Sequence, residues 1–268
     1  MSSGANYIRA KVLAAPVGIE FESSTPPPKR TLALDSLPLI DAADEPLDGC
    51  VLDSVLSDTE CKRLVGAAEA CKGFSWWDPS GDESPEKRSL RNADTLEFLD
   101  ESLCAALWER LRHHVPERVE VTREQRRFER DLEGTWEAIG LNPHLLINRY
   151  EAGGHFAPHA DGSTIVNFNE RSLYTVLVYL NTCSDGGATQ LLRSEQAEGT
   201  QLTASGARVA RPEAVMHAVA PNAGRCLMYW HEVVHAGEPV GACGLKYCMR
   251  SEDGAQTTGC DLSHEPSP

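Results

Sequence analysis

Residues 172–192 read SLYTVLVYLNTCSDGGATQLL, and this stretch shows the pattern that decides the fold. An apolar run rich in β-branched and aromatic residues is followed by the pair Gly186–Gly187 and a second short apolar run. Such runs, separated by glycine turns, predict β-strands joined by tight connections. The pattern recurs in HLLINRY (144–150), AVMHAVA (214–220), RCLMYW (225–230) and LKYCMR (245–250). Many short strands with glycine turns between them predict a β-sandwich or barrel.

The first half of the chain has a helical pattern instead. Ser57 and Glu60 have the spacing of a capping box, and apolar residues then recur with helical periodicity in CKRLVGAA (61–68). We expect a second helix over 100–114, a third, charged helix over 122–132, and a loop over 72–95. Helices followed by strands indicate an α+β fold rather than alternating βαβ units.

These changes of composition suggest three parts. Residues 1–46, which include the triple proline of STPPPKR (24–30), are expected to be a weakly ordered lead-in. Residues 47–251 are expected to form one domain, with a helical part at 47–142 and a strand-rich core at 143–251. Residues 252–268 are expected to be a disordered tail.

The overall charge and the cysteines limit the function classes. The 268 residues carry a formal net charge of −15, which repels phosphate backbones, so we expect no nucleic-acid partner. No stretch reaches 18 apolar residues, so we expect no membrane span. The nine cysteines include no C-x-x-C pair, which predicts free thiols in a reducing compartment and a cytoplasmic location.

HEVVH (231–235) has the form of the H-E-x-x-H zinc-protease signature. In that interpretation His231 and His235 bind zinc and Glu232 is the general base. The signature requires a helix, but a strand-like run precedes it and Pro239 follows closely, which argues against a helix. The third ligand of the extended signature is also absent, because Glu238 and Gly241 stand where glycine and histidine would be.

A different metal site takes only His235 from this pentapeptide. His159 and Asp161 are two residues apart, so on a strand both side chains face the same side. Two histidines and one carboxylate form the facial triad of non-haem Fe(II) oxygenases. Lys246 lies on a strand that is otherwise apolar, and a buried ammonium needs an anionic partner such as a dicarboxylate co-substrate.

On these residues the chain resembles the prolyl 4-hydroxylase-like family of Fe(II)/2-oxoglutarate-dependent dioxygenases. The resemblance extends over about three-quarters of the chain. It is carried, in the family's order, by VLSDTECKRLVGAAE (55–69), INRYEAGGHFAPHADGS (147–163), LYTVLVYLN (173–181), GGATQLL (186–192), VAPNAGRCLMYWHEVVHAGEPV (219–240) and GLKYCMR (244–250).

The resemblance implies a double-stranded β-helix, that is, a jelly-roll or cupin-like barrel, with helices packed against it. It implies that His159, Asp161 and His235 bind iron and that Lys246 pairs with the distal carboxylate of 2-oxoglutarate. It places Tyr150 and Tyr179 in the 2-oxoglutarate pocket. The implied reaction hydroxylates a C–H bond and consumes 2-oxoglutarate and O₂, releasing succinate and CO₂, with ascorbate as a reductant.

Two alternatives stay open at this point. One is a zinc metallohydrolase that uses HEVVH, and the other is a non-catalytic jelly-roll binding module. For the dioxygenase, the substrate is a peptidyl residue such as proline or a small molecule, and the sequence gives no oligomeric state. Trp76 and Trp77, adjacent in a polar segment, suggest either a substrate platform or an anchor for the loop.

Overall fold

The computed structural model describes residues 13–14, 29–32, 49–76, 84–121, 133–167, 169–192, 200–242 and 244–257. For 13–14, 29–32 and 252–257 it describes the backbone alone. The predicted helix over 122–132 and most of the lead-in therefore lie outside the described residues, as do Trp77 and residues 258–268.

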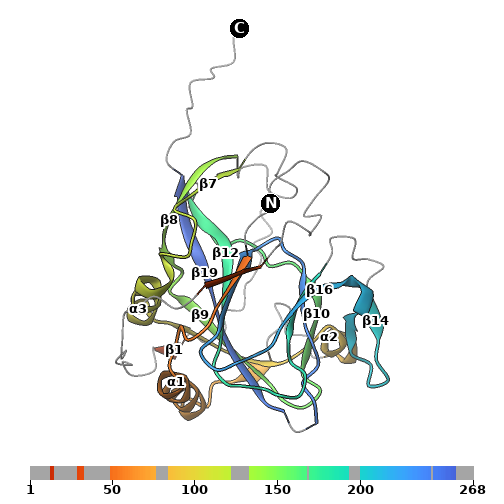
Figure 1. The fold of residues 1–268 in the computed structure, drawn as a ribbon. Coiled ribbons are helices and arrows are strands. Elements are labelled where there is room, and N and C mark those ends of the chain that lie inside the picture. The colour runs from red at the N-terminus through yellow and green to blue at the C-terminus, as the bar shows by residue number, and fades with distance from the viewer. Residues whose placement is uncertain are drawn as a thin grey trace, which may run out of the picture.

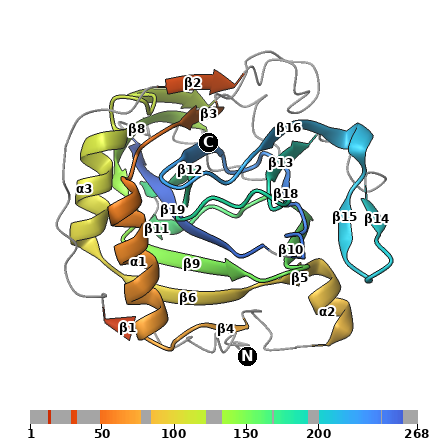
Figure 2. The ribbon, with the colours of Figure 1, turned by 60° about the horizontal axis from the view of Figure 1, so that its bottom comes forward.

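Within the described ranges, two β-sheets lie opposite each other (Figures 1 and 2). The major sheet has twelve strands. Its main path runs through β1 (Leu13–Ala14), β6 (Asp94–Leu99), β9 (His144–Tyr150), β19 (Lys246–Thr257), β12 (Glu170–Tyr179), β17 (Cys226–Trp230), β3 (Gly49–Leu52) and β2 (Lys29–Leu32). Four further strands pair beside this path: β4 (Ser75–Trp76), β7 (Arg118–Val121), β8 (Gly134–Leu141) and β11 (Ile165–Asn167).

The minor sheet has five strands, in the order β16 (Val215–Val219), β13 (Thr189–Leu192), β18 (His235–Gly237), β10 (His155–His159) and β5 (Arg91–Asn92). The chain passes between the sheets at almost every connection, because β9, β12, β17 and β19 belong to one sheet and β10, β13, β16 and β18 to the other. This winding is that of a double-stranded β-helix, so the predicted fold class is confirmed. A separate hairpin of β14 (Thr200–Leu202) and β15 (Arg208–Ala210) stands beside the minor sheet, and η2 (Pro212–Ala214) follows it.

Strand alternation divides the side chains of the major sheet between two cores. On β12, Leu177 and Tyr179 point toward the minor sheet, whereas Val176 and Val178 point outward. On β19, Cys248 faces inward and Met249 outward. The inner face thereby encloses a space between the sheets, and the outer face needs a cover of its own.

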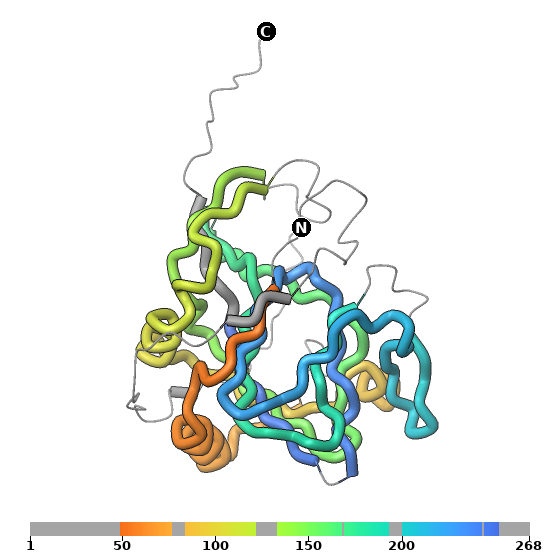
Figure 3. Tube along the Cα trace, in the orientation of Figure 1, coloured from red at the N-terminus to blue at the C-terminus, as the bar shows by residue number. Residues whose placement is uncertain are grey.

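Two helices supply that cover, α1 (Asp58–Ala70) and α3 (Glu101–Leu111), and they lie on the same side of the trace in Figure 3. Leu64 of α1 and Leu107 of α3 are buried in the outer core. The capping box predicted for Ser57 and Glu60 is present. Glu60 also forms a buried ion pair with Arg110, in which the Nη2 and Oε1 atoms are 2.8 Å apart.

The turn in the quoted stretch requires glycine. Gly186 and Gly187 have φ angles of 69° and 74°, in the left-handed region. A Cβ atom on Gly186 would lie 2.3 Å from the carbonyl oxygen of Pro239, so a side chain at this position would collide with backbone.

Three boundary predictions are wrong. The 72–95 segment is not a loop throughout, because it contains β4, β5 and a helix, α2 (Pro85–Leu90), which the Ser84 hydroxyl caps. The 47–142 part is not only helical, since the short strands β3 to β8 lie within it. The tail does not start at 252, because β19 continues to Thr257 and pairs with β8 and β12, where backbone hydrogen bonding replaces apolar side chains as the ordering interaction.

Two expectations from composition can be compared with the structure. In the parts of the chain that the structure describes, no helix combines the length and the apolar character needed to cross a bilayer. The described cysteines are free thiols, as predicted: Cys50, Cys61, Cys71, Cys104, Cys183, Cys226 and Cys248.

Candidate active site

The two candidate histidines are delivered by neighbouring strands of the minor sheet. His159 ends β10, His235 begins β18, and they are direct cross-strand partners. A register shift between Phe156 and His159 brings these two side chains to one face, although they are three positions apart on the strand. The Phe156 ring stacks on the His159 imidazole, with centroids 3.6 Å apart.

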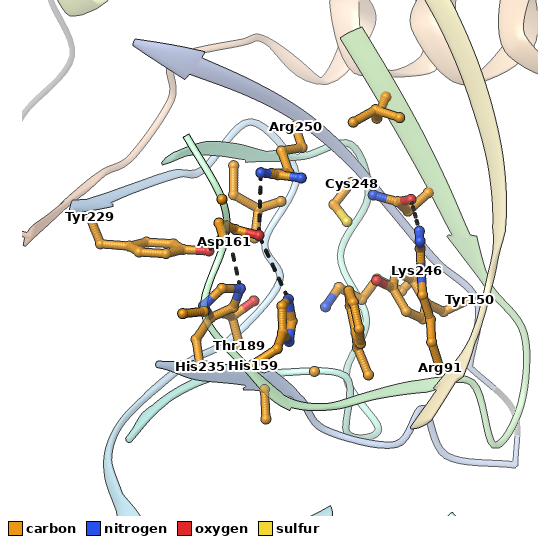
Figure 4. Close-up of a pocket in the computed structure, with 18 of the residues that line it drawn as sticks. Arg91, Tyr150, His159, Asp161, Thr189, Tyr229, His235, Lys246, Cys248 and Arg250 are labelled. Atoms are coloured by element: carbon orange, nitrogen blue, oxygen red, sulfur yellow. Dashed lines mark hydrogen bonds and ion pairs between the residues drawn. The ribbon is translucent and has the colours of Figure 1, made fainter. Parts of the chain in front are cut away.

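Asp161 joins them from just beyond the end of β10. The prediction that His159 and Asp161 share a strand is wrong, because the strand ends at His159. A hydrogen bond from the Asp161 amide to the His231 carbonyl oxygen, 3.0 Å long, holds the backbone in place. Asp161 Oδ1 lies 3.7 Å from His159 Nε2, and Asp161 Oδ2 lies 3.6 Å from His235 Nε2 (Figure 4). One ligand atom from each residue lies within 4.8 Å of the other two, so the structure brings all three together.

Backbone hydrogen bonds orient both imidazoles. His159 Nδ1 lies 2.8 Å from the carbonyl oxygen of Ala157, and His235 Nδ1 lies 2.9 Å from that of Val233. A carbonyl only accepts, so each Nδ1 carries the proton and each Nε2 presents its lone pair to the centre of the triad. Burial lowers the pKa of His159 to about 3 and also lowers that of His235. Both rings are therefore neutral near pH 7, the form that binds metals.

Three side chains hold the Asp161 carboxylate. Thr175 Oγ1 donates to its Oδ2 at 2.7 Å and the Tyr229 hydroxyl donates to the same oxygen at 3.3 Å. Arg250 Nη2 lies 3.3 Å from Oδ1. Burial alone would raise the pKa of Asp161, but the charge of Arg250 and the Thr175 hydrogen bond hold it well below its usual range. Asp161 is thus a fixed anion.

These groups line a cavity of about 330 Å³ between the sheets, and Lys246 lines it too. Figure 4 shows the triad on one side and Lys246 with Tyr150 on the other. The Lys246 side chain is buried, and its Nζ lies 5.1 Å from the centre of the Tyr150 ring and 5.6 Å from that of Tyr179. Burial lowers the pKa of Lys246, and no carboxylate among the described residues forms an ion pair with it. The ammonium therefore suits an anionic ligand.

The two predicted tyrosines occupy different positions. Tyr150 lines the cavity directly. Tyr179 is fully buried and is not among the residues that line the cavity, and its hydroxyl donates to Thr189 Oγ1 at 2.8 Å. Thr189 lines the cavity in its place. Tyr179 is therefore not positioned to contact a ligand in this cavity directly.

HEVVH does not form the helix that a zinc protease requires. Residues 231–234 make a turn after β17, and β18 begins at His235. His231 points elsewhere, with its Nδ1 atom 2.8 Å from the Leu173 carbonyl oxygen and its ring against Trp230. It is not part of the triad of ligand atoms. The zinc-hydrolase alternative is therefore wrong for this pentapeptide.

Sequence reasoning missed several side chains of this site. Arg250 is four residues after Lys246 on the same strand, so period-two alternation could have placed both on one face. Thr175 and Tyr229 have no comparable signal in the sequence, and Arg91 lies in the 72–95 segment that the sequence predicts to be a loop. Trp76 lies outside the cavity, with the Arg88 guanidinium 4.6 Å over its ring.

The donor set fits one kind of metal centre. Two neutral imidazoles and one ionised carboxylate, all on one side, leave further coordination positions open toward the cavity. This is the ligand set of the non-haem Fe(II) facial triad. The Nδ1 atoms of both imidazoles and the Asp161 carboxylate all have hydrogen-bond partners in the protein. Such outer contacts hold metal ligands in place.

Comparisons with known proteins support this assignment in part. Residues 145–251 match the model of the 2OG-Fe(II) oxygenase superfamily. No curated protein sequence matches the chain.

Three solved structures are similar in shape. They are a viral collagen prolyl hydroxylase from Paramecium Bursaria Chlorella virus-1 bound to 2OG (17% identity, TM-score 0.43, 78% of this chain and 96% of that one), a Pseudomonas putida prolyl-4-hydroxylase (12%, 0.45, 76% and 91%), and a Trichoplax adhaerens prolyl hydroxylase in complex with a hypoxia inducible factor oxygen degradation domain peptide fragment (16%, 0.47, 76% and 82%).

At these TM-scores the structural similarities carry no argument about activity. The family match includes His159, Asp161, His235 and Lys246, and the sheets around them have the winding that the sequence resemblance implied. Residues 145–251 of this chain are therefore similar to the 2OG-Fe(II) oxygenase superfamily, and the match covers the candidate site.

Proposed function

We propose that this chain is an Fe(II)- and 2-oxoglutarate-dependent dioxygenase that hydroxylates a C–H bond. The observation that carries the proposal is the presence of the triad and the buried Lys246 in one cavity of about 330 Å³. His159, Asp161 and His235 would hold Fe(II), and Lys246 would hold the distal carboxylate of 2-oxoglutarate. Bound iron and 2-oxoglutarate supply the oxidising chemistry that converts R–H and O₂ into R–OH, succinate and CO₂.

The protein's own contribution is position and protonation. Lys246 presents a charge-assisted donor at the enclosed end of the cavity, which fixes the direction in which a dicarboxylate lies. The Ala157 and Val233 carbonyls keep both Nε2 atoms aimed at the metal position. Phe156 and Tyr229 flank the imidazoles and restrict water at the centre.

The substrate is proposed as a peptidyl residue, of which proline is the first candidate from the sequence resemblance, or a small molecule. Ascorbate as a reductant belongs to the same proposal. The orientation of the two histidines and the aspartate supports an active enzyme over a binding module, because it is the orientation that a bound metal requires.

The test is turnover of 2-oxoglutarate by the full chain with Fe(II), read as succinate release, with mass spectrometry of a substrate pool for a gain of one oxygen. Asp161→Ala should abolish both Fe(II) binding and succinate release. Glu97→Gln is the matched control, because Glu97 is another carboxylate of the same cavity but pairs with His144 instead of the triad. Succinate release that survives in Asp161→Ala would refute the site assignment.

A further inference from the structure

Strand β11 forms an open edge of the major sheet. Among the residues that the structure describes, it pairs with β12 and with no other strand. Ile165 and Val166 of this strand are 58% and 63% exposed, although both side chains are apolar. Sheet edges are usually protected by charged residues or proline, because an apolar edge offers its backbone groups to another chain. Neither kind of residue occurs in β11, so this edge is suited to pair with a further strand.

The hydrogen bonds to β12 show which backbone groups of β11 face outward. The Ser172 amide donates to the Thr164 carbonyl oxygen at 2.9 Å, and Ile165 lies opposite Arg171. Hydrogen-bonded and non-hydrogen-bonded pairs alternate along an antiparallel ladder. Ile165 and Arg171 are therefore a non-hydrogen-bonded pair, and the N–H and C=O groups of Ile165 point away from β12. One donor and one acceptor thus face outward at the open edge.

This edge continues directly from the wall of the cavity. Ala160, Asp161 and Gly162 line the cavity, and Ala160 and Gly162 are exposed to solvent. Because four extended residues span at most about 14 Å, the Cα atom of Ile165 lies within that distance of the Cα atom of Asp161. A peptide paired with β11 would therefore need only about four further residues to reach the metal position.

We propose that the substrate is an extended, positively charged peptide segment that pairs with β11 as an added strand and so brings one of its residues to the triad. The inference rests on the proposed function and selects the peptidyl class of substrate. Strand addition takes its affinity from backbone hydrogen bonds and its specificity from the alternate side chains of the peptide. β11 is short, so it suits a short peptide segment rather than the edge of another sheet.

Charge favours a cationic peptide over a second copy of this chain. The formal net charge of −15 attracts a cationic segment and repels another copy. The hairpin of β11 and β12 agrees with this sign. The Glu170 carboxylate, at the start of β12, is partly exposed, whereas Arg171 is buried.

The test measures peptide binding rather than turnover. The full chain is loaded with Mn(II) in place of Fe(II) and with N-oxalylglycine in place of 2-oxoglutarate. Two pools of acetylated and amidated peptides of about eight residues, the length that covers β11 and reaches the triad, are then offered to it. One pool contains lysine and the other glutamate among otherwise randomised neutral residues. We expect affinity selection with mass spectrometry to recover peptides from the lysine pool, and the tightest of them becomes the probe for calorimetry.

A proline variant tests the outward N–H group of Ile165. Ile165→Pro removes this donor without breaking a hydrogen bond to β12, and proline is tolerated where the N–H of an edge strand faces solvent. It should weaken binding of the selected peptide by at least about tenfold, as for loss of a hydrogen bond that leaves its partner unpaired. The Mn(II) affinity of the variant, measured alongside, shows that it is folded.

Leu202→Pro is the matched control. Leu202 is 62% exposed and lies on β14, which pairs with β15 alone among the described strands. The Thr203 amide donates to the Ala207 carbonyl oxygen at 2.9 Å, so Leu202 and Arg208 are also a non-hydrogen-bonded pair and the Leu202 N–H points outward. No residue of β14 lines the cavity, so this variant should keep the peptide affinity within about twofold.

A scan of the peptide tests the same contact without any variant protein. Each backbone amide of the selected peptide is N-methylated in turn, and the affinity for the wild-type protein is measured. A strand turns the backbone groups of every second residue toward its neighbour, so the affinity should fall at alternate positions of the paired part. Losses that show no alternation would mean that the peptide binds without strand pairing, and they would overturn the proposal.

The remaining outcomes separate the two proposals. Recovery of glutamate peptides, recovery of no peptide, or equal binding by the wild-type protein and Ile165→Pro overturns strand addition while the dioxygenase proposal stands. Dimerisation of the wild-type protein in sedimentation velocity that Ile165→Pro abolishes would identify a second copy as the partner of β11, and it also overturns the peptide proposal. Failure of the wild-type protein to bind Mn(II) and N-oxalylglycine refutes the proposed function, and the strand-addition proposal falls with it.

Discussion

His159 and His235 are direct cross-strand partners, and the centroids of their imidazole rings lie 4.2 Å apart. Adjacent antiparallel strands therefore fix two of the three candidate ligands before any metal binds. Only Asp161 comes from outside a strand, and its amide is tied to the His231 carbonyl oxygen. A site held by sheet hydrogen bonds is preorganised, which is the condition for precise ligand geometry.

Lys246→Met should separate co-substrate binding from metal binding. The change removes the charge-assisted contact proposed for 2-oxoglutarate, so the affinity for 2-oxoglutarate should fall about 10–100-fold. Mn(II) affinity should stay within about twofold, because Lys246 does not contact the triad. Calorimetry with each ligand checks both values.

The same variant makes a prediction about stability. Burial lowers the pKa of Lys246, which means that the folded state disfavours its charge. Lys246→Met should therefore leave the free energy of unfolding of the metal-free protein unchanged or raise it. A clear loss of thermal stability in the absence of 2-oxoglutarate would contradict this account of the ammonium.

His231→Gln and His235→Gln should differ sharply in metal binding, although both residues belong to HEVVH. His235 presents Nε2 to the triad, so its loss should weaken Mn(II) binding by at least about 100-fold, the upper end of the effect of losing an outer-shell contact. His231 contacts the Leu173 carbonyl oxygen instead, and its variant should keep Mn(II) affinity within about twofold. Equal losses in the two variants would restore the zinc-protease interpretation.

Glu60→Ala should be among the most destabilising changes outside the cavity. It removes the capping contact to the Ser57 amide and leaves the Arg110 guanidinium buried without its carboxylate. Loss of one partner of a buried ion pair costs about 3–5 kcal/mol. Denaturant unfolding measures the change.

Two variants calibrate that measurement. Ser57→Ala removes the cap alone and should cost about 1 kcal/mol. Glu137→Ala breaks the exposed ion pair with Arg118 and should cost less than about 1 kcal/mol. If Glu60→Ala costs no more than Glu137→Ala, the buried pair does not stabilise the packing of α1 against α3.

The reactivity of the cysteine thiols should decrease as their burial increases. Burial raises the pKa of Cys61 to about 11 and that of Cys104 to about 12, so both folded thiols stay protonated at pH 8.5. Among the seven cysteines that the structure describes, the half-buried Cys71 should react with iodoacetamide first, and Cys61 and Cys104 only after unfolding. Peptide mass spectrometry of partly labelled protein gives the order.

The raised pKa values of Cys61 and Cys104 also predict that the folded protein loses stability at alkaline pH. An unfolded thiol releases its proton near pH 9, whereas these two folded thiols hold theirs to about pH 11 and about pH 12. Above pH 9 the unfolded state therefore binds fewer protons, and the contribution to stability falls by about 1.4 kcal/mol per pH unit for each thiol. Cys104→Ala should show a shallower decline between pH 9 and 10.5 than the wild-type protein.

Local patterns in the sequence predicted much of this structure. The capping box at Ser57 and Glu60 and the alternating run around Val176 fix local conformation through short-range contacts, and both are present. The sequence pattern did not predict the strand at residues 252–257, because this segment carries few apolar side chains. These residues nevertheless extend β19, since β8 and β12 provide backbone hydrogen-bonding partners on both sides.

The candidate site likewise has some features that the sequence predicts and others that depend on tertiary structure. By itself, the sequence determined which residue types form the triad and that Lys246 needs an anion, because chemical identity and the buried character of a strand are local properties. Only the tertiary structure decided that His159 and His235 pair across strands, that Thr189 rather than Tyr179 lines the cavity, and that Arg91 and Arg250 reach the same cavity. These positions depend on register, on one bulge in β10 and on the facing of two sheets, which are set by contacts between residues far apart in the chain.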